Sequence, residues 1–318
     1  MIICMAVVAM LFASCKNEDI LISRDVTFVV NPYDVINGFV NYQANDGDLD
    51  LLPNSYRVRA QVYVYDMDGK LVDYDVDYLK DYHSSMNASF DLPDGHYIAI
   101  ATTDVVEYNG SVDFEFWKFE GKEKLTELKI NHAGYLGYEH KILGVGCQNV
   151  NVQNGQVYFP IRLEPQGALA LCIVWGIHSF ADVSSYDLMM NRSFNCCSFK
   201  SDGTWEMSCE ESILNKYVHR FNPNNFSASV YGGYGYQFIP TGMSKFRWDA
   251  ETTSGELEDI TDGERSISIV SGNMYQFELF LPELEFSITN LNGKGLSCPV
   301  DRLASDSDKN QYAGVNSK

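Results

Sequence analysis

Tyr56 to Asp66 reads YRVRAQVYVYD and is followed, after Met67 to Lys70 (MDGK), by LVDYDVDY at residues 71–78. Apolar residues alternate with polar or aromatic ones in both runs, a pattern typical of half-buried strands with a period of two. The residues between the runs form a turn signal, with Gly69 available for a positive φ. The sequence therefore predicts two β-strands joined by a tight turn.

The second run carries a row of acids. Asp73, Asp75 and Asp77 fall on a single face of the predicted strand. Such a row could bind a cation or a cationic partner, but acidic side chains also keep an exposed sheet edge from pairing with other chains. We favour the second interpretation, a solvated edge strand.

Short runs rich in Val, Ile, Tyr and Phe recur along the rest of the chain, with turn signals about every ten residues. This spacing predicts an all-β protein made of two tandem Greek-key or transthyretin-like β-sandwiches. The other predicted strands cover residues 25–31, 87–92, 96–102, 114–119, 125–130, 141–147, 156–163, 168–175, 266–270, 272–281 and 285–289.

Glu164-Pro165-Gln166-Gly167 interrupts the pattern between two of these strands. A chain of 318 residues is long for one core and suits two domains. We therefore expect an N-terminal sandwich over residues 25–165 and a C-terminal sandwich over residues 166–300, placed end to end. Residues 301–318 are polar and are predicted to form a disordered tail.

The composition excludes one class of partner. The 43 Asp and Glu residues outnumber the 23 Lys and Arg residues, which gives a net charge of −20. Nucleic-acid binding needs clustered basic side chains, so a nucleic-acid partner is not expected. An acidic surface fits a solvated protein of the cell surface, and a hydrophobic content of 45% is enough for folded cores.

The N-terminal sequence MIICMAVVAMLFASCKNED indicates where the protein resides. Met1 to Phe12 is apolar and too short to span a bilayer, and small residues then precede Cys15. We interpret residues 1–14 as a signal peptide and residues 15–24 as a linker that is lipidated at Cys15. The alternative is an apolar N-terminal strand of a soluble protein.

Several motifs carry a family resemblance. Leu11 to Cys15 (LFASC) resembles a bacterial lipobox, and Lys16 to Asp19 (KNED) resembles the acidic surface-export tag of Bacteroidales lipoproteins. Val64 to Lys70 (VYDMDGK), Leu92 to Tyr97 (LPDGHY) and Gly272 to Tyr275 (GNMY) look like motifs of Bacteroidales fimbrial lipoproteins. The chain therefore resembles two-domain surface lipoproteins of the fimbrial anchor and fimbrillin-like class.

This resemblance implies a lipoprotein held in the cell outer membrane through lipid on Cys15 and exposed at the cell surface. It implies a fimbrial anchor or accessory subunit that acts in fimbrium assembly and adhesion, with fimbrial subunits as partners. Pilins of that family polymerise by strand exchange after cleavage at an arginine. Here the matching residue, Arg24, precedes the first predicted strand. Cleavage there frees no strand-length groove, so a lipid-retaining subunit is expected.

The C-terminal half contains a second predicted hairpin, Asn195 to Cys209, around an Asp202-Gly203 turn signal. If the turn has two residues, Cys196 and Cys209 face each other at the short end of the Cα separation for a disulfide. Cys197 then points to the opposite face as a small core residue. A longer turn shifts the register and could make Cys197 the partner instead.

The spacing of residues also predicts the structure of two further segments of the C-terminal half. Ser212 to Phe221 has apolar residues at helical intervals and is predicted to be a short amphipathic helix, the one helix of the second domain. Tyr231 to Tyr236 (YGGYGY) is predicted to be a loop. Its Tyr231, Tyr234 and Tyr236 are candidate contacts for a glycan or a protein, because tyrosines on a flexible backbone make such surfaces. The alternative is a bulge or loop that only joins two strands.

The sequence contains no motif of a catalytic site: nucleophile elbow, P-loop, dinucleotide fingerprint and zinc-protease motif are all absent. We expect no enzyme activity and no cofactor. Asp46, Asp48 and Asp50 have the spacing of the first ligands of a calcium loop, but the following positions depart from that pattern. A solvated acidic loop is therefore favoured, with these aspartates as a weak calcium candidate and no other metal site.

Overall fold

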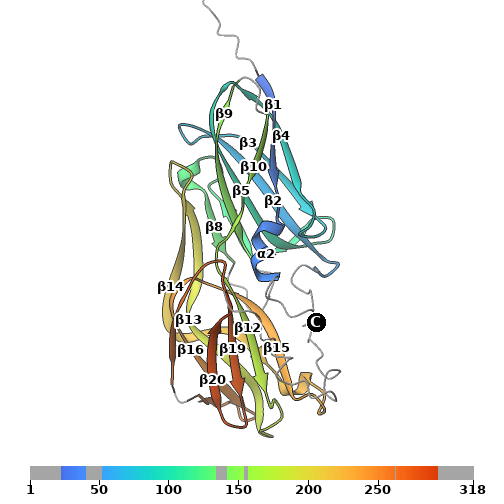
Figure 1. Cartoon of the computed structure of the whole chain (residues 1–318), viewed down its shortest axis with the longest axis vertical. Coiled ribbons are helices and arrows are strands. Elements are labelled where there is room, and N and C mark those ends of the chain that lie inside the picture. The colour runs from blue at the N-terminus through green and yellow to red at the C-terminus, as the bar shows by residue number, and fades with distance from the viewer. Residues whose placement is uncertain (1–22, 41–51, 134–141, 154–156, 262, 293–318) are drawn as a thin grey trace, which may run out of the picture.

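The computed structural model describes residues 23–40, 52–133, 142–153, 157–261 and 263–292. It shows an elongated molecule in which β-sheets follow one another along the long axis (Figure 1). Strand β1 begins at one end, and the strands of the C-terminal half extend to the other (Figure 1). The predicted all-β architecture with two sandwiches is confirmed.

The first sandwich packs a small sheet against a large one. The small sheet has the order β10-β1-β4, and the large sheet has the order β11-β9-β5-β2-β3, with β6 beside β5. Apolar side chains such as Val26 and Phe28 of β1 are fully buried between the sheets. The strands are β1 (Ser23–Val30), β2 (Tyr56–Asp66), β3 (Leu71–Leu79), β4 (Met86–Pro93), β5 (Gly95–Tyr108), β6 (Val112–Glu115), β9 (Gly144–Val152), β10 (Tyr158–Ile161) and β11 (Glu164–Pro165).

Strands β2 and β3 form the hairpin that the sequence predicts, with Gly69 at φ +76° in its turn. Both faces of β2 are buried, although a half-buried strand was expected. The inner face packs into the core, and β7 (Trp117–Glu120), η1 (Leu125–Glu127) and β8 (Lys129–His132) lie against the outer face. The Tyr65 hydroxyl, for example, donates a hydrogen bond to the carbonyl of Lys122 at 3.0 Å.

The one α-helix of the described residues lies in the first sandwich, where the sequence did not predict it. Helix α2 (Tyr33–Val40) buries Val35, Ile36 and Phe39. It lies at the end of this sandwich that faces the C-terminal half (Figure 1). Gly144 makes room for it, because a Cβ there would lie 2.3 Å from a methyl group of Val35.

The predicted helix at residues 212–221 is wrong. This segment belongs to β14 (Trp205–Phe221), which pairs with β13 (Val183–Phe199). Two register shifts fall in this segment, and Ile213 is 79% exposed while Val218 and Phe221 are buried. Bulges of this kind break the alternation of a strand, so the apolar residues acquire a spacing that resembles a helix.

The second sandwich packs a sheet of order β15-β12-β19-β20 against a sheet of order β17-β16-β13-β8-β7, with β14 beside β13 and β18 beside β16. Its core contains Trp248, Phe246 and Phe277, all fully buried. The remaining elements are β12 (Ala168–Trp175), η2 (Pro223–Asn225), β15 (Gly232–Ile239), β16 (Gly242–Thr252), β17 (Leu257–Asp259), β18 (Arg265–Ile269), β19 (Met274–Phe280) and β20 (Glu285–Asn290).

Both sandwiches place their first strand in the same way. Strand β1 lies between β10, which is parallel to it, and β4, which is antiparallel. Strand β12 likewise lies between the parallel β19 and the antiparallel β15. Each first strand is therefore bonded on both sides, and removing it would open its sheet.

The two halves share more than an end-to-end contact, which corrects the expected arrangement. Cys196 to Ser198 of β13 pair with β8, so strands from both sides of residue 165 lie in one sheet. The tip of the β13–β14 hairpin reaches the first sandwich, where a Cβ on Gly203 would lie 2.4 Å from the sulfur of Cys147 and 2.8 Å from Ile98. The domain boundary at residue 165 itself stays a prediction.

An aromatic cluster fills the junction between the halves. The rings of Trp117 and Phe194 meet edge to face at 5.4 Å, and Phe194 stacks on Phe238 at 5.2 Å. These residues come from β7, β13 and β15, so the cluster joins both sandwiches. Aromatic pairs of this geometry stabilise a contact beyond the area they bury.

Candidate functional site

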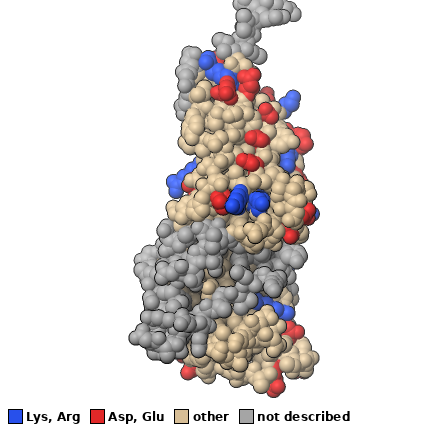
Figure 2. Space-filling view, turned by 90° about the vertical axis from the view of Figure 1, so that its right-hand side faces the viewer, with Lys and Arg blue, Asp and Glu red and all other residues tan. Residues whose placement is uncertain are grey.

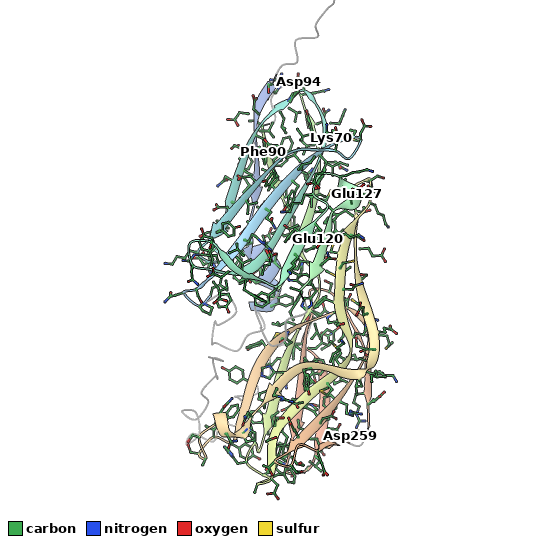
Figure 3. The ribbon with its side chains drawn as sticks, turned by 180° about the vertical axis from the view of Figure 1, so that it is seen from behind. Lys70, Phe90, Asp94, Glu120, Glu127 and Asp259 are labelled. Atoms are coloured by element: carbon green, nitrogen blue, oxygen red, sulfur yellow. The ribbon has the colours of Figure 1, made fainter. Side chains whose placement is uncertain are left out.

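The start of β1 is the first candidate site, because the resemblance assigns a cleavage role to an arginine there. Arg24 is the second residue of β1, and its guanidinium donates to the carboxylate of Asp94 at 2.6 Å. The neighbouring Ser23 hydroxyl donates to Asp91. Figure 3 shows Asp94 at the end of the molecule where β1 begins. In the sequence Asp94 stands out only as part of the LPDGHY motif, and nothing there indicates this ion pair.

The strand that follows Arg24 is held firmly in place. Val26, Phe28 and Val30 have no exposed surface, and Phe28 packs against the rings of Phe90 and Phe159 at 5.9 and 5.8 Å. All eight residues of β1 pair with β4. A chain cut after Arg24 would therefore keep almost the whole of β1 in its sheet.

Two groups of predicted site residues lie outside the described residues. These are the lipidation candidate Cys15 and the weak calcium candidates Asp46, Asp48 and Asp50. Elsewhere in the described part of the chain, no group of three or more His, Cys, Asp or Glu side chains could hold a metal ion. No helix of the described residues is both long and apolar enough to cross a membrane.

The predicted pairing of Cys196 with Cys209 is wrong, because the hairpin turn has three residues instead of two. The amide of Gly203 donates to the carbonyl of Lys200 at 3.0 Å, and Gly203 has φ +83°. This is the three-residue loop with glycine at the left-handed position. It shifts the register by one residue, and a further shift follows between Phe194 and Cys197.

Cys209 therefore pairs with Phe194, and Cys196 faces Ser208, whose hydroxyl lies 3.3 Å from the Cys196 sulfur. Cys197 pairs with Met207 and is fully buried, so its predicted place in the core is confirmed. The described cysteines, Cys147, Cys172, Cys196, Cys197 and Cys209, are all free thiols.

Burial makes most of these thiols poor nucleophiles. It raises the pKa of Cys147 to about 11 and the pKa of Cys197 to about 12. The pKa of the fully buried Cys172 is raised as well. Since the thiolate is the reactive form, burial disfavours nucleophilic reaction at these three residues.

The predicted tyrosine loop is a strand. Residues 232–239 form β15, which pairs with β12 over its whole length. Tyr236 is only 9% exposed, Tyr234 is half-buried, and their rings meet edge to face at 6.0 Å. The three tyrosines therefore do not form one exposed platform. The glycines allow close packing here, since a Cβ on Gly235 would lie 2.4 Å from the His219 ring.

Tyr231 alone keeps a candidate contact role. It is 43% exposed and stacks on Trp175 with ring centroids 6.4 Å apart, and Phe280 lies at the same distance. The indole N–H of Trp175 donates to Glu278 at 2.6 Å, which fixes the ring beneath Tyr231. This group lies at the ends of β12 and β19, at the far end of the molecule from β1 (Figure 1).

The first sandwich contains a buried charge network that the sequence analysis did not identify. The guanidinium of Arg59 donates to both carboxylate oxygens of Asp104, at 2.9 and 2.7 Å, and to Glu115 at 2.6 Å. It also donates to the carbonyl of Trp117 at 2.8 Å. Burial raises the pKa of Asp104 and the Arg59 charge opposes that rise. This network joins β2 to β5, β6 and β7.

The charge of the visible surface agrees with the composition. Figure 2 shows acidic side chains spread over the first sandwich, with Lys and Arg in fewer places. No extended basic surface appears on the described part of this face (Figure 2). Binding of a polyanion at this face is therefore not favoured.

Comparison with known proteins gives matches among solved structures alone. No family model matches the chain, and no curated protein matches it. A candidate adhesin from Bacteroides thetaiotaomicron is 14% identical, over 84% of this chain and 96% of that one, with a TM-score of 0.48.

Two other similar structures are fimbrial proteins. The fimbrial anchor protein Mfa2 from Porphyromonas gingivalis is 12% identical, over 84% of this chain and 95% of that one, with a TM-score of 0.40. A fimbrial assembly protein from Parabacteroides distasonis is 12% identical, over 84% and 98% of the chains, with a TM-score of 0.38.

Proposed function

We propose that this chain is a lipid-anchored protein of the cell outer membrane that serves as a fimbrial anchor or accessory subunit in fimbrium assembly and adhesion. The N-terminal run that ends at Cys15 supports the anchor, and the motifs shared with fimbrial lipoproteins support the class. Its partners would be outer-membrane lipid and fimbrial subunits.

The placement of β1 is the observation that carries the proposal. A subunit that polymerises by strand exchange needs an empty groove in its sheet, whereas here β1 fills the position between β10 and β4. Arg24 stands at the start of that strand, so cleavage after it empties no groove. The arrangement favours a subunit that keeps its N-terminus, and with it the lipid.

The elongated shape also suits this role. Strand β1 begins at one end of the molecule, and β12 and β19, whose last residues lie beside Tyr231, reach the other (Figure 1). A lipid on Cys15 would therefore hold the first sandwich nearer the membrane and present the second sandwich outward.

The lipid anchor is tested by fractionating the bacterium that makes the protein. We expect acylated Cys15 as the mature N-terminus in mass spectrometry of the membrane fraction, and release of the protein from that fraction in Cys15→Ala. An intact Met1, or a wild-type protein that stays soluble, would contradict the anchor.

The fimbrial role is tested separately with Arg24→Ala. An uncleaved anchor should leave the amount and length of surface fimbriae unchanged in this variant, while deletion of the gene should alter them. Lys118→Ala is the control. If Arg24→Ala abolishes incorporation of this protein into fimbriae while Lys118→Ala does not, the protein is a cleaved pilin and the proposal fails.

A second candidate function is contact with a glycan or a protein through Tyr231, favoured by its exposure over Trp175 and Phe280. Tyr231→Ala should then lower binding to a surface-glycan array or to fimbrial subunits, while Tyr158→Ala, at a more exposed tyrosine on β10, should not. Equal binding by both variants would remove this candidate.

A further inference from the structure

Strand β3 ends the large sheet of the first sandwich, and no described strand pairs with its outer side. Among the residues that the structure describes, a backbone bond covers only its start, where the amide of Leu71 donates to the carbonyl of Glu123 at 3.0 Å. Beyond that point the side chains of Val72 and Tyr74 are 43% and 53% exposed. A long exposed edge rich in Val and Tyr is a template on which another chain can add a strand.

The register shows which backbone groups of β3 lie at this free edge. The amide of Tyr108 in β5 donates to the carbonyl of Ser55 at 2.7 Å, which makes the odd-numbered residues of β2 the ones bonded to β5. Even-numbered residues of β2 then bond to β3, because backbone groups alternate sides along a strand. Val62, for example, pairs with Asp75.

The same alternation turns the backbone of the three aspartates toward β2 and leaves the amides between them pointing away from the sheet. Each of these outward amides is already bonded to the carboxylate of the residue before it. The donors and acceptors are Tyr74 to Asp73 at 2.8 Å, Val76 to Asp75 at 2.9 Å, and Tyr78 to Asp77 at 2.8 Å.

We propose that Asp73, Asp75 and Asp77 close the β3 edge against pairing with a second copy of this chain. The carboxylates occupy the amide donors that an added strand would need. They also repel a second copy: in an antiparallel pair centred on Asp75, that residue faces its own counterpart and Asp73 faces Asp77 of the other copy. Like charges directly opposite each other destabilise strand pairing.

A second copy is the partner that this edge must exclude, because in the same antiparallel pair Tyr74 would face Val76 of the other copy and favour pairing. Val72, Tyr74 and Val76 have high β-propensity, and Tyr74 is held flat against Tyr63, with ring planes 16° apart. The acids pair in register with Val62 and its neighbours on β2 but are themselves exposed, so they are solvated charges on an edge strand. Natural sheets use such charges to prevent edge-to-edge association. This inference does not depend on the fimbrial role.

The test uses the full chain with Cys15→Ala, so that no lipid holds copies together, in sedimentation velocity over a range of concentrations. We expect the parent to sediment as a single copy. The triple variant D73T/D75T/D77T, which removes both the charges and the carboxylate acceptors, should shift to dimers or larger species. In that variant, the amides of Tyr74, Val76 and Tyr78 should exchange hydrogen more slowly as concentration rises.

Two further variants separate the effect of the charges on self-association from the effect of the carboxylate acceptors and from a general loss of surface charge. D73N/D75N/D77N keeps a side-chain oxygen acceptor and removes only the charge, so it should associate less than the threonine variant. D182T/E256T/E283T removes three exposed acids from loops of the second sandwich and should stay a single copy. If the folded threonine variant also stays a single copy, or if the control associates equally, the β3 acids do not close this edge and the proposal is wrong.

Discussion

The two long hairpins of the molecule differ in how closely their structure follows their sequence. The β2–β3 hairpin keeps one register from Leu79 to Asp73 and has a single shift next to its turn. The β13–β14 hairpin is longer, with 17 residues in each strand, and has three register shifts. The first lies within one sandwich, whereas the second spans both.

This difference has a physical cause. Strand β2 is hydrogen-bonded on both sides, to β3 and β5. Its register is fixed, because a shift of one residue would move core side chains to the other face of the sheet. Strand β13 pairs with β16 along its first part and with β8 near its end, so it runs through one sheet that extends across both sandwiches. Its bulges let the strand bend along that sheet. Four predictions test this comparison.

Arg59→Leu should have the largest effect, because it breaks the network that secures β2. It leaves Asp104, which is 1% exposed, without its bidentate partner. Removing one partner of a buried ion pair costs about 3–5 kcal/mol of unfolding free energy. Urea unfolding followed by tryptophan fluorescence measures this loss.

The matched control is Arg57→Leu, two residues earlier on β2. Arg57 donates only to the backbone carbonyls of Asn54 and Tyr56, so its loss should cost about 1 kcal/mol. Equal losses in the two variants would show that the Asp104 network does not stabilise this hairpin.

Gly203→Ala should loosen the tip of the second hairpin. A Cβ at this position would lie 2.4 Å from the Cys147 sulfur, and its φ of +83° is unfavourable for alanine. Overpacking and backbone strain together should cost about 2–3 kcal/mol in urea unfolding.

Gly255→Ala separates these two effects, because Gly255 has φ +87° with nothing within 4 Å of its Cβ position. It should cost about 1 kcal/mol, the backbone contribution alone. If Gly203→Ala lowers the unfolding free energy by no more than this, the hairpin tip does not pack tightly against the first sandwich.

His219 gives β14 a dependence on pH. Burial lowers its pKa from 6.5 to about 4, so the folded protein holds the ring neutral. The unfolded chain takes up a proton first, and the stability is therefore complete above pH 6.5 and lost as the pH falls toward 4. Between pH 7 and pH 5 the loss should be about 2 kcal/mol.

His219→Gln tests the assignment, since glutamine does not titrate. The difference in unfolding free energy between pH 7 and pH 5 should be smaller in this variant than in the parent. An identical pH dependence would mean that other groups cause the acid loss.

The smallest effect is expected from reductant, because the thiols of the second hairpin are free. Adding dithiothreitol should change the unfolding free energy by less than about 0.5 kcal/mol, whereas a disulfide closing this hairpin would contribute about 3 kcal/mol. Thiol labelling of the unfolded protein should detect both Cys196 and Cys209. A loss of stability in reductant would instead support the disulfide and the two-residue turn that the sequence predicts.

The sequence by itself determined the features that depend on local alternation. The strands β2 and β3, the turn at Gly69, the edge acids and the burial of Cys197 follow from a period of two and from turn chemistry, which nearby residues encode. The resemblance carried by the N-terminus and by VYDMDGK and LPDGHY also needed no coordinates.

The tertiary structure alone decided the register of β13 and β14, because their bulges depend on the distant strands β16 and β8 that pair with β13 and not on nearby residues. It likewise turned residues 212–221 into a strand and the tyrosine segment into β15, since each gains a full row of backbone bonds from a distant partner. Helix α2 forms from a short segment with β-branched residues because Val35 and Ile36 find a core there.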